Sequence, residues 1–125
     1  MRNGGLMGNR ILKESICHNQ RLASLGLFAE NLFYRLIVNC DDYGNFLADP
    51  RVIKGRLFPL RENLTVNEVE DGLLDLSKAG LISFYSTEDQ DYLHLSGWDE
   101  HQKLNYRTAM YPPPEKVAMR RAYYS

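Results

Sequence analysis

The chain has 125 residues, of which 44% are hydrophobic and 25% are charged, and its net charge at pH 7 is −1. These values are ordinary for one globular domain, and a charge so close to zero favours no particular class of partner. No apolar run approaches the roughly 20 residues that a membrane-spanning helix needs, and the first residues lack the apolar core of a signal peptide. We therefore expect a cytoplasmic protein that does not enter a membrane.

The cysteines and histidines are few and scattered. Cys17 and Cys40 each have an apolar neighbour, and we expect both to be small buried thiols in a reducing compartment. None of the three histidines stands in a zinc-ligand spacing. No P-loop, G-x-S-x-G or H-E-x-x-H motif is present, so the sequence predicts neither a metal, nor a cofactor, nor an enzyme.

The clearest element in the first third of the chain is a long helix. Residues 1–9 are rich in Gly and Asn and are predicted to be flexible, and residues 10–19 form a short helical or irregular lead-in. The long helix is expected over 24–40, with Ser24 as its N-cap and Gly44 in the turn that follows. Its apolar residues follow the spacing of one buried helical face: Leu25, Phe28, Ala29, Leu32, Phe33, Leu36, Ile37 and Cys40.

Two further helices follow a short strand at 46–48. Asp49 is the expected N-cap of the first of them, with Pro50 at its first position. Thr65 caps the second, and Glu68 completes a T-x-x-E capping box. The predicted buried face of this second helix consists of Val66, Val69, Leu73 and Leu76.

A β-hairpin closes the predicted domain. Its strands are expected at 81–86 and 92–97, joined by the polar turn TEDQD, with His94 facing outward. The residues expected to point inward are Leu81, Phe84, Leu93 and Leu95. The order of helix, short strand, helix, helix and hairpin is that of a winged helix-turn-helix. The sequence therefore predicts an α+β, mostly α, winged-helix domain over 10–102, and a basic tail or linker containing Pro-Pro-Pro over 103–125.

The chain also resembles a known family. It is similar to the N-terminal domain of phage replisome organiser proteins, in the stretches "RILKESIC", "FYRLIVNCDDYGNF", "RLFPL" and "YLHLSGW…HQ". These proteins are relatives of the DnaD-type primosomal proteins of low-GC Gram-positive bacteria and their phages. The similarity covers roughly residues 10–112. It implies a winged-helix domain in the cytoplasm of a bacterial host, which binds at or near a replication origin and helps recruit the host helicase loader or helicase.

The helix that Thr65 caps is acidic where a winged helix would read DNA. Its predicted outer face carries Glu68, Asp71 and Asp75. Carboxylates are repelled by phosphates, and a helix in the major groove normally offers Arg, Lys, Asn or Gln. Three interpretations remain open for this face: a solvated surface that keeps the protein soluble, a docking surface for a basic partner protein or a second copy, or a helix that reads DNA bases directly in spite of its charge.

The predicted DNA-binding residues are basic and lie in the preceding helix, after the hairpin and in the tail. They are Arg51, Lys54, Arg56, Arg61, Lys103, Arg107, Arg120 and Arg121. Such residues can hold phosphates without reading sequence. Arg10 and Lys13 add to them, and Tyr106 and Tyr111 stand among the later cations, which suits stacking on single-stranded or distorted DNA. The alternatives are a helix surface charged for solubility, and a tail that is disordered or packs on a neighbouring subunit.

Three functions stay open at this point. The first is a non-enzymatic replication-initiation module that binds DNA, and the second is a docking or oligomerisation domain without strong DNA affinity. The third is a phage transcriptional regulator, which should bind a palindrome as a dimer; the acidic helix speaks against it. Asp41 and Asp42 lack a third ligand in range, and we expect them to end the long helix and shape the turn rather than hold a metal.

Overall fold

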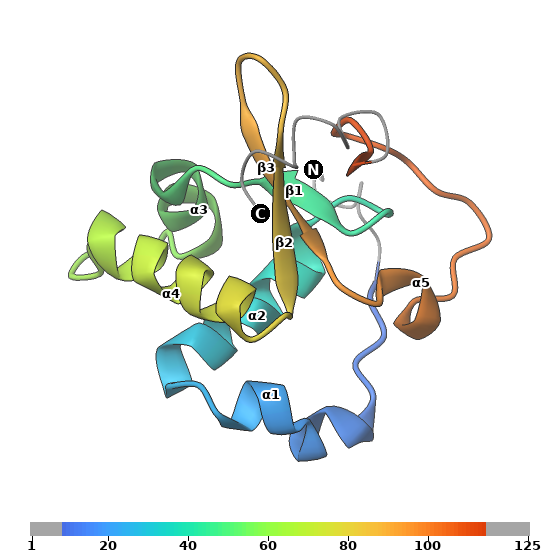
Figure 1. Ribbon diagram of the computed structural model, residues 1–125, viewed down its shortest axis with the longest axis horizontal. Helices are drawn as coiled ribbons and strands as arrows, with labels where there is room; N and C mark the ends of the chain where they lie inside the picture. Colours follow the sequence, from blue (N-terminus) through green and yellow to red (C-terminus); the bar gives the residue numbers. More distant parts are fainter. Residues whose placement is uncertain (1–8, 115–125) are drawn as a thin grey trace.

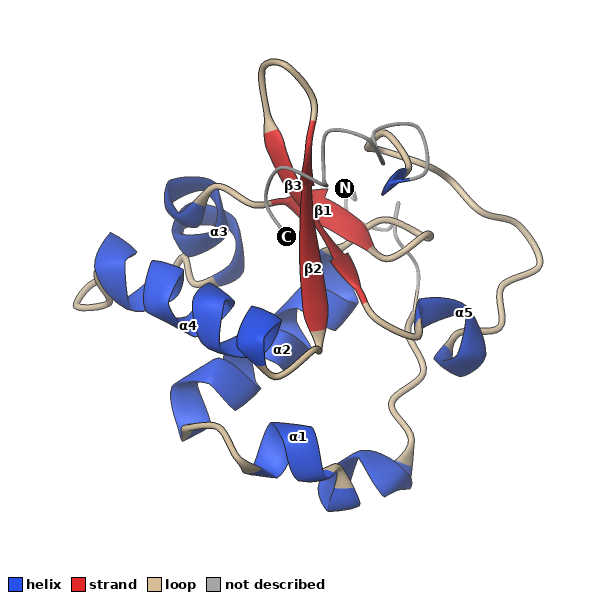
Figure 2. Cartoon of the chain, in the orientation of Figure 1, coloured by secondary structure: helices blue, strands red, loops and turns tan. Residues whose placement is uncertain are grey.

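The computed structural model describes residues 9–114 and shows an α+β fold (Figures 1 and 2). Its elements are the 3-10 helix η2 (Glu14–His18), α1 (Gln20–Ala23), α2 (Leu27–Asn39), β1 (Asn45–Leu47), α3 (Pro50–Leu57), α4 (Val66–Lys78), β2 (Ile82–Ser86), β3 (Asp91–Leu95) and α5 (Trp98–His101). Residues 1–8 and 115–125 lie outside the described part, and with them the predicted contacts Arg120 and Arg121. Within the described part, no helix combines the length and the apolar composition needed to cross a membrane.

The predicted starts of α3 and α4 are confirmed. The carboxylate of Asp49 accepts the backbone N–H of Arg51 at 2.9 Å. Thr65 and Glu68 form the reciprocal capping box: the Thr65 hydroxyl accepts the Glu68 N–H at 3.1 Å, and the Glu68 carboxylate accepts the Thr65 N–H at 2.9 Å. The bond from the Thr65 N–H holds the pKa of Glu68 below its usual value, because it favours the charged carboxylate.

The predicted start of α2 is wrong. Asn19 caps the separate short helix α1 by accepting the N–H of Leu22, and Ser24 lies at the end of that helix, where its hydroxyl donates to the Arg21 carbonyl. The helix α2 therefore begins only after Gly26. The apolar face of α2 is confirmed in its main part, where the buried residues are Ala29, Leu32, Phe33, Leu36, Ile37 and Cys40.

The three strands form one antiparallel sheet in the order β1-β3-β2, and the hairpin of β2 and β3 extends beyond the helices (Figure 1). Its register places Phe46, Leu93 and Phe84 opposite one another on the face that joins the hydrophobic core. The other face carries Tyr85 and Tyr92, which are also opposite one another. Of the four residues expected to point inward, Leu81, Leu93 and Leu95 are buried and Phe84 is half-buried against the core.

One expectation about a single residue fails, and a second holds only in part. Val66 is 36% exposed, because it occupies the first turn of α4, and the buried face begins only at Val69. His94 lies on the sheet face opposite Leu93 and Leu95, as expected, but it is half-buried, and its Nδ1 lies 2.8 Å from the side-chain oxygen of Asn45 in the neighbouring strand. Since cross-strand partners share a face of the sheet, the pair links β1 to β3 beyond the backbone ladder.

The two cysteines differ in exposure. Cys40 is buried, its thiol donates to the Ile37 carbonyl, and burial raises the pKa of this thiol to about 12. Cys17 is exposed, against the expectation that both would be buried, because it belongs to η2, which has no buried residue.

We expect a disulfide reagent at about pH 8 to modify one thiol per native chain rapidly, because only a thiolate reacts and the buried Cys40 stays protonated there. The absorbance of the released thiol measures this, before and after unfolding in guanidinium. Cys17→Ser should abolish the fast reaction and leave only the slow modification of Cys40. Rapid modification of both thiols in the native chain would contradict the burial of Cys40.

Candidate nucleic-acid interface

The predicted contacts Lys54 and Arg56 of α3 and Arg61 of the following loop do not form one continuous face. Lys54 is half-buried, and Arg56 and Arg61 are exposed. Residues two apart on a helix point to different sides, so Lys54 and Arg56 diverge. The Arg56 guanidinium lies 5.1 Å from the centroid of the Phe46 ring, which directs it toward β1. The structure therefore spreads the predicted contacts around the C-terminal half of α3.

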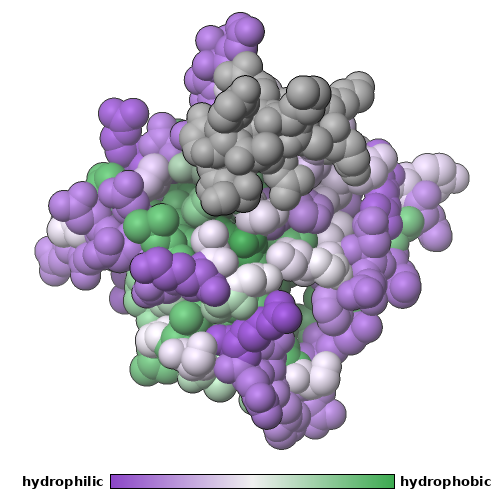
Figure 3. Space-filling view, in the orientation of Figure 1, coloured by the Kyte–Doolittle hydropathy of each residue, from purple (hydrophilic) through white to green (hydrophobic). Residues whose placement is uncertain are grey.

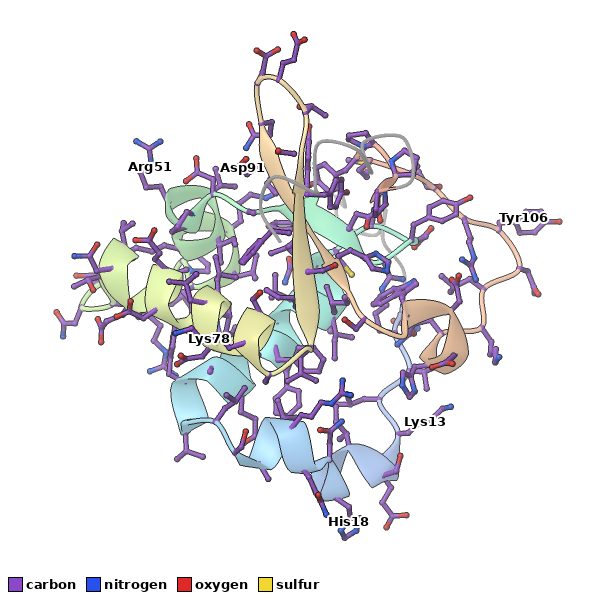
Figure 4. All side chains as sticks on the ribbon, in the orientation of Figure 1. Lys13, His18, Arg51, Lys78, Asp91 and Tyr106 are labelled. Carbon is purple, nitrogen blue, oxygen red and sulfur yellow. The ribbon has the colours of Figure 1, made fainter. Side chains whose placement is uncertain are left out.

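Arg51 lies in acidic surroundings. Its side chain is 79% exposed, and its Nε is 3.5 Å from the carboxylate of Asp49. A shallow hollow between the start of α3 and the hairpin turn is lined by Arg51 together with Asp49, Glu88, Asp89 and Asp91. Figure 4 shows Arg51 and Asp91 on these neighbouring elements. A phosphate approaching Arg51 would meet these carboxylates, so Arg51 is the weakest of the predicted DNA contacts on α3.

The predicted contacts after the hairpin lie elsewhere. Lys103 is exposed, but Arg107 is bound within the domain. The Arg107 Nη1 lies 2.6 Å from the carboxylate of Asp99, and its guanidinium is 5.4 Å from the centroid of the Tyr43 ring. In the view of Figure 1, α3 and α5 lie on opposite sides of the sheet. The structure thus keeps the cations after α5 apart from those of α3.

The acidic face of α4 is exposed as predicted. Glu68, Asp71 and Asp75 all point to solvent, and Lys78 is the basic residue in the last turn of the helix. Figure 3 shows hydrophilic side chains at the outer end of α4, with hydrophobic ones beside them along the rest of the helix. A negatively charged surface attracts a basic partner and repels nucleic acid.

Arg10 is expected from the sequence to add to the cations available to DNA, but the structure buries it in an ion pair. Its side chain is only 2% exposed, with Nη2 3.0 Å from the carboxylate of Asp42. The guanidinium also donates to the carbonyls of Ile37 and Cys40 at the end of α2, and it lies 5.3 Å from the centroid of the Trp98 ring. Arg10 therefore neutralises a buried carboxylate and satisfies the last carbonyls of a helix.

Asp41 and Asp42 shape the turn after α2, as predicted, but they also bind a distant segment. Both are buried. Their carboxylates accept backbone N–H groups from the turn and from the segment after α5: Tyr43, Asn45, Thr108, Met110 and Tyr111. We call residues 108–112 the strap. Within residues 9–114, no group of three or more His, Cys, Asp or Glu side chains could hold a metal ion.

The helix α5 fixes the N-terminal segment in a similar way. The buried Gln102 side chain accepts the N–H of Ile11 at 2.9 Å and donates to the Ile11 carbonyl at 2.8 Å. The Trp98 indole donates to the Asp42 carbonyl at 2.8 Å. Gln102 belongs to the quoted stretch "YLHLSGW…HQ", but no local pattern distinguishes it from an exposed glutamine, and the sequence predicts no structural role for it.

Comparison with known proteins adds no family to this picture: no family model, no curated protein and no solved structure matches the chain. What the structure itself defines is an α+β fold in which a three-stranded antiparallel sheet joins a helical core. The distribution of charge over that fold then provides the basis for a function.

Proposed function

We propose that the chain is a winged-helix module that binds DNA through backbone contacts and takes part in replication initiation in a bacterial host. The element order supports the winged-helix assignment, since α2, β1, α3 and α4 precede a hairpin whose strand β3 pairs with β1. The resemblance of the stretches quoted above supports the role at an origin. It also supports a host helicase loader or helicase as the protein partner.

The observation that best supports DNA binding is the set of cations on α3 and on the loop that follows it. Lys54, Arg56 and Arg61 are at least partly exposed, and none of them lines the acidic hollow that contains Arg51. Phosphates bound by such side chains release their counterions, which makes the affinity depend on salt. Since α4 presents carboxylates, it would face away from DNA and toward a basic surface of a protein partner or of a second copy.

We expect the combined substitution of Lys54, Arg56 and Arg61 by Ala to weaken binding to double- and single-stranded DNA. The slope of log K against log salt should become shallower by about 2–3, since each lost phosphate contact removes roughly 0.7–0.9. Fluorescence anisotropy of labelled DNA, repeated over a salt series, measures both quantities.

Two controls separate this mechanism from a general effect of charge. Arg51→Ala removes a cation from the same helix. It should change the slope by less than the roughly 0.7–0.9 of one phosphate contact, because Asp49 and the hairpin carboxylates already surround Arg51. The combined substitution of Asp71 and Asp75 by Ala, which leaves the capping box of Thr65 and Glu68 intact, should leave DNA binding as strong or strengthen it. If the acidic substitutions weaken binding as much as the basic ones, the assignment of surfaces is wrong.

A second candidate is a docking domain without useful DNA affinity, and the exposed carboxylates of α4 and of the hairpin turn favour it. No binding to either form of DNA at low salt would select this function. A transcriptional regulator is less well supported, because it would have to read a palindrome with the acidic α4 in the groove.

A further inference from the structure

We propose that the strap, residues 108–112, is exchangeable, and that the site that holds it accepts the strap of a second copy of this chain. The inference concerns self-association and does not depend on DNA binding. It rests on three properties of the structure: how the site recognises the strap backbone, how it recognises Tyr111, and how loosely the strap is connected to the domain.

The site recognises the backbone of the strap through buried carboxylates. Asp42 accepts the N–H of Thr108 at 2.8 Å and donates its own backbone N–H to the Thr108 carbonyl at 3.3 Å. Asp41 accepts the N–H of Met110 at 3.0 Å and that of Tyr111 at 3.3 Å.

Asp41 is 0% exposed and Asp42 is 8% exposed. If the strap left, Asp41 would keep the N–H groups of Tyr43 and Asn45. Asp42 would keep Arg10, but each carboxylate would lose the donors of the strap. Because unpaired buried acceptors are costly, the site favours an extended peptide in this place.

The site also recognises one side chain and one carbonyl of the strap. The half-buried Tyr111 ring lies 5.7 Å from the Phe46 ring, edge to face, and 6.0 Å from the Tyr92 ring, measured between centroids. The Tyr85 hydroxyl donates to the Pro112 carbonyl at 2.8 Å. Two carboxylates that accept backbone N–H groups, the aromatic rings beside Tyr111 and the Tyr85 hydroxyl that binds the Pro112 carbonyl together select an extended peptide with a Tyr-Pro step.

The connection between α5 and the strap is weakly attached. Lys103, Asn105 and Tyr106 are exposed, and Tyr106, at 92% exposure, projects away from the fold in Figure 4. The ion pair between Arg107 and Asp99 involves a carboxylate that is 77% exposed, and exposed pairs contribute little to stability. The connection therefore offers little resistance to release of the strap, and the strap is held mainly by its own contacts with the two buried carboxylates and the core. The prolines at its end favour an extended backbone, which lowers the entropy lost when it binds again.

A second copy is the occupant that fits, because it carries the same residues in the same order. Every contact that the strap makes within one chain can form unchanged between two chains, which is why exchange of an element is a low-cost route to dimers. Within one chain, the short connection gives the strap an effective concentration on the order of millimolar. Exchange should therefore prevail only where copies are concentrated, or where one copy has lost its own strap.

A complementation experiment on full-length chains tests the proposal. Met110→Pro removes an N–H that Asp41 binds and should free the site, whereas Asp41→Asn keeps the shape of the site but places an amide against the strap N–H groups. Each variant alone should be monomeric by light scattering up to about 1 mM. An equimolar mixture should form a one-to-one heterodimer, in which the intact strap of the Asp41→Asn chain occupies the intact site of the Met110→Pro chain.

A second measurement keeps the test decisive if Asp41→Asn does not fold. A labelled peptide with the sequence of residues 107–114 should bind the Met110→Pro chain saturably in fluorescence anisotropy, and the same peptide with Ala in place of Tyr111 should bind at least tenfold more weakly. The unchanged chain should bind the peptide weakly, because its own strap fills the site. The proposal is overturned if the mixture stays monomeric and the peptide does not bind, or if either variant dimerises alone.

Discussion

Replacement of Arg10 by Met is expected to lower the free energy of unfolding by about 3–5 kcal/mol, the cost of leaving one partner of a buried ion pair alone. The Asp42 carboxylate is only 11% exposed, so water cannot replace the guanidinium. The variant also leaves the carbonyls of Ile37 and Cys40 without this donor at the end of α2. Equilibrium denaturation in urea measures the change, and methionine preserves most of the side-chain volume.

Lys13→Met is the matched control, since Lys13 lies in the same segment and is exposed. It should change the free energy of unfolding by no more than about 0.5 kcal/mol. The double substitution of Arg10 by Met and Asp42 by Asn should lose less than the sum of the two single substitutions, because removing the charge also removes the need for its partner. Equal effects of Arg10→Met and Lys13→Met would show that the buried pair does not form.

The second large effect is expected for Gly44→Ala, with a loss of about 2–5 kcal/mol in the free energy of unfolding. Gly44 has a φ of +82°, a left-handed conformation that costs other residues about 1–2 kcal/mol. A Cβ there would also lie 2.7 Å from Cγ of Trp98, so the indole would have to shift, and such overpacking typically costs about 1–3 kcal/mol. Denaturation in urea again measures the change.

Gly55→Ala provides the control within the same chain. Gly55 lies inside α3, and a Cβ at this position meets nothing within 4 Å. Because glycine weakens a helix interior, this substitution should raise the free energy of unfolding by about 0.5–1 kcal/mol. If Gly44→Ala proves as well tolerated as Gly55→Ala, the turn after α2 does not have the conformation described here.

The elements that the sequence predicted well are those specified by neighbouring residues. Asp49 and Pro50 define the start of α3, and Thr65 with Glu68 defines the start of α4, because a cap acts within one helical turn. Ser24 failed as a cap because Asn19 starts a separate short helix that Ser24 ends, and α2 begins after Gly26 without a side-chain cap. Local competition between caps is hard to weigh from residue types alone.

The anchoring of both flanking segments could not be predicted, because it depends on contacts between distant residues. The bond between Asp42 and Thr108 joins residues 66 apart, and the bonds between Gln102 and Ile11 join residues 91 apart. Nothing near Arg10 in the sequence shows that it is buried rather than free to bind a phosphate. The charge of Lys54, Arg56 and Arg61 is evident from the sequence, and their role in DNA binding stays a prediction.

The double use of Asp42 has a mechanical consequence. One carboxylate oxygen binds Arg10 and the other binds the N–H of Thr108, so the two segments that flank the domain meet at a single side chain. Tension applied through these two segments would first break the outer bonds of the strap to Tyr85 and Asp41, and would then reach Asp42 from both sides, so the bonds would break one after another rather than together. The domain would therefore yield at its ends under a small force, while α2 and the sheet behind it remain folded.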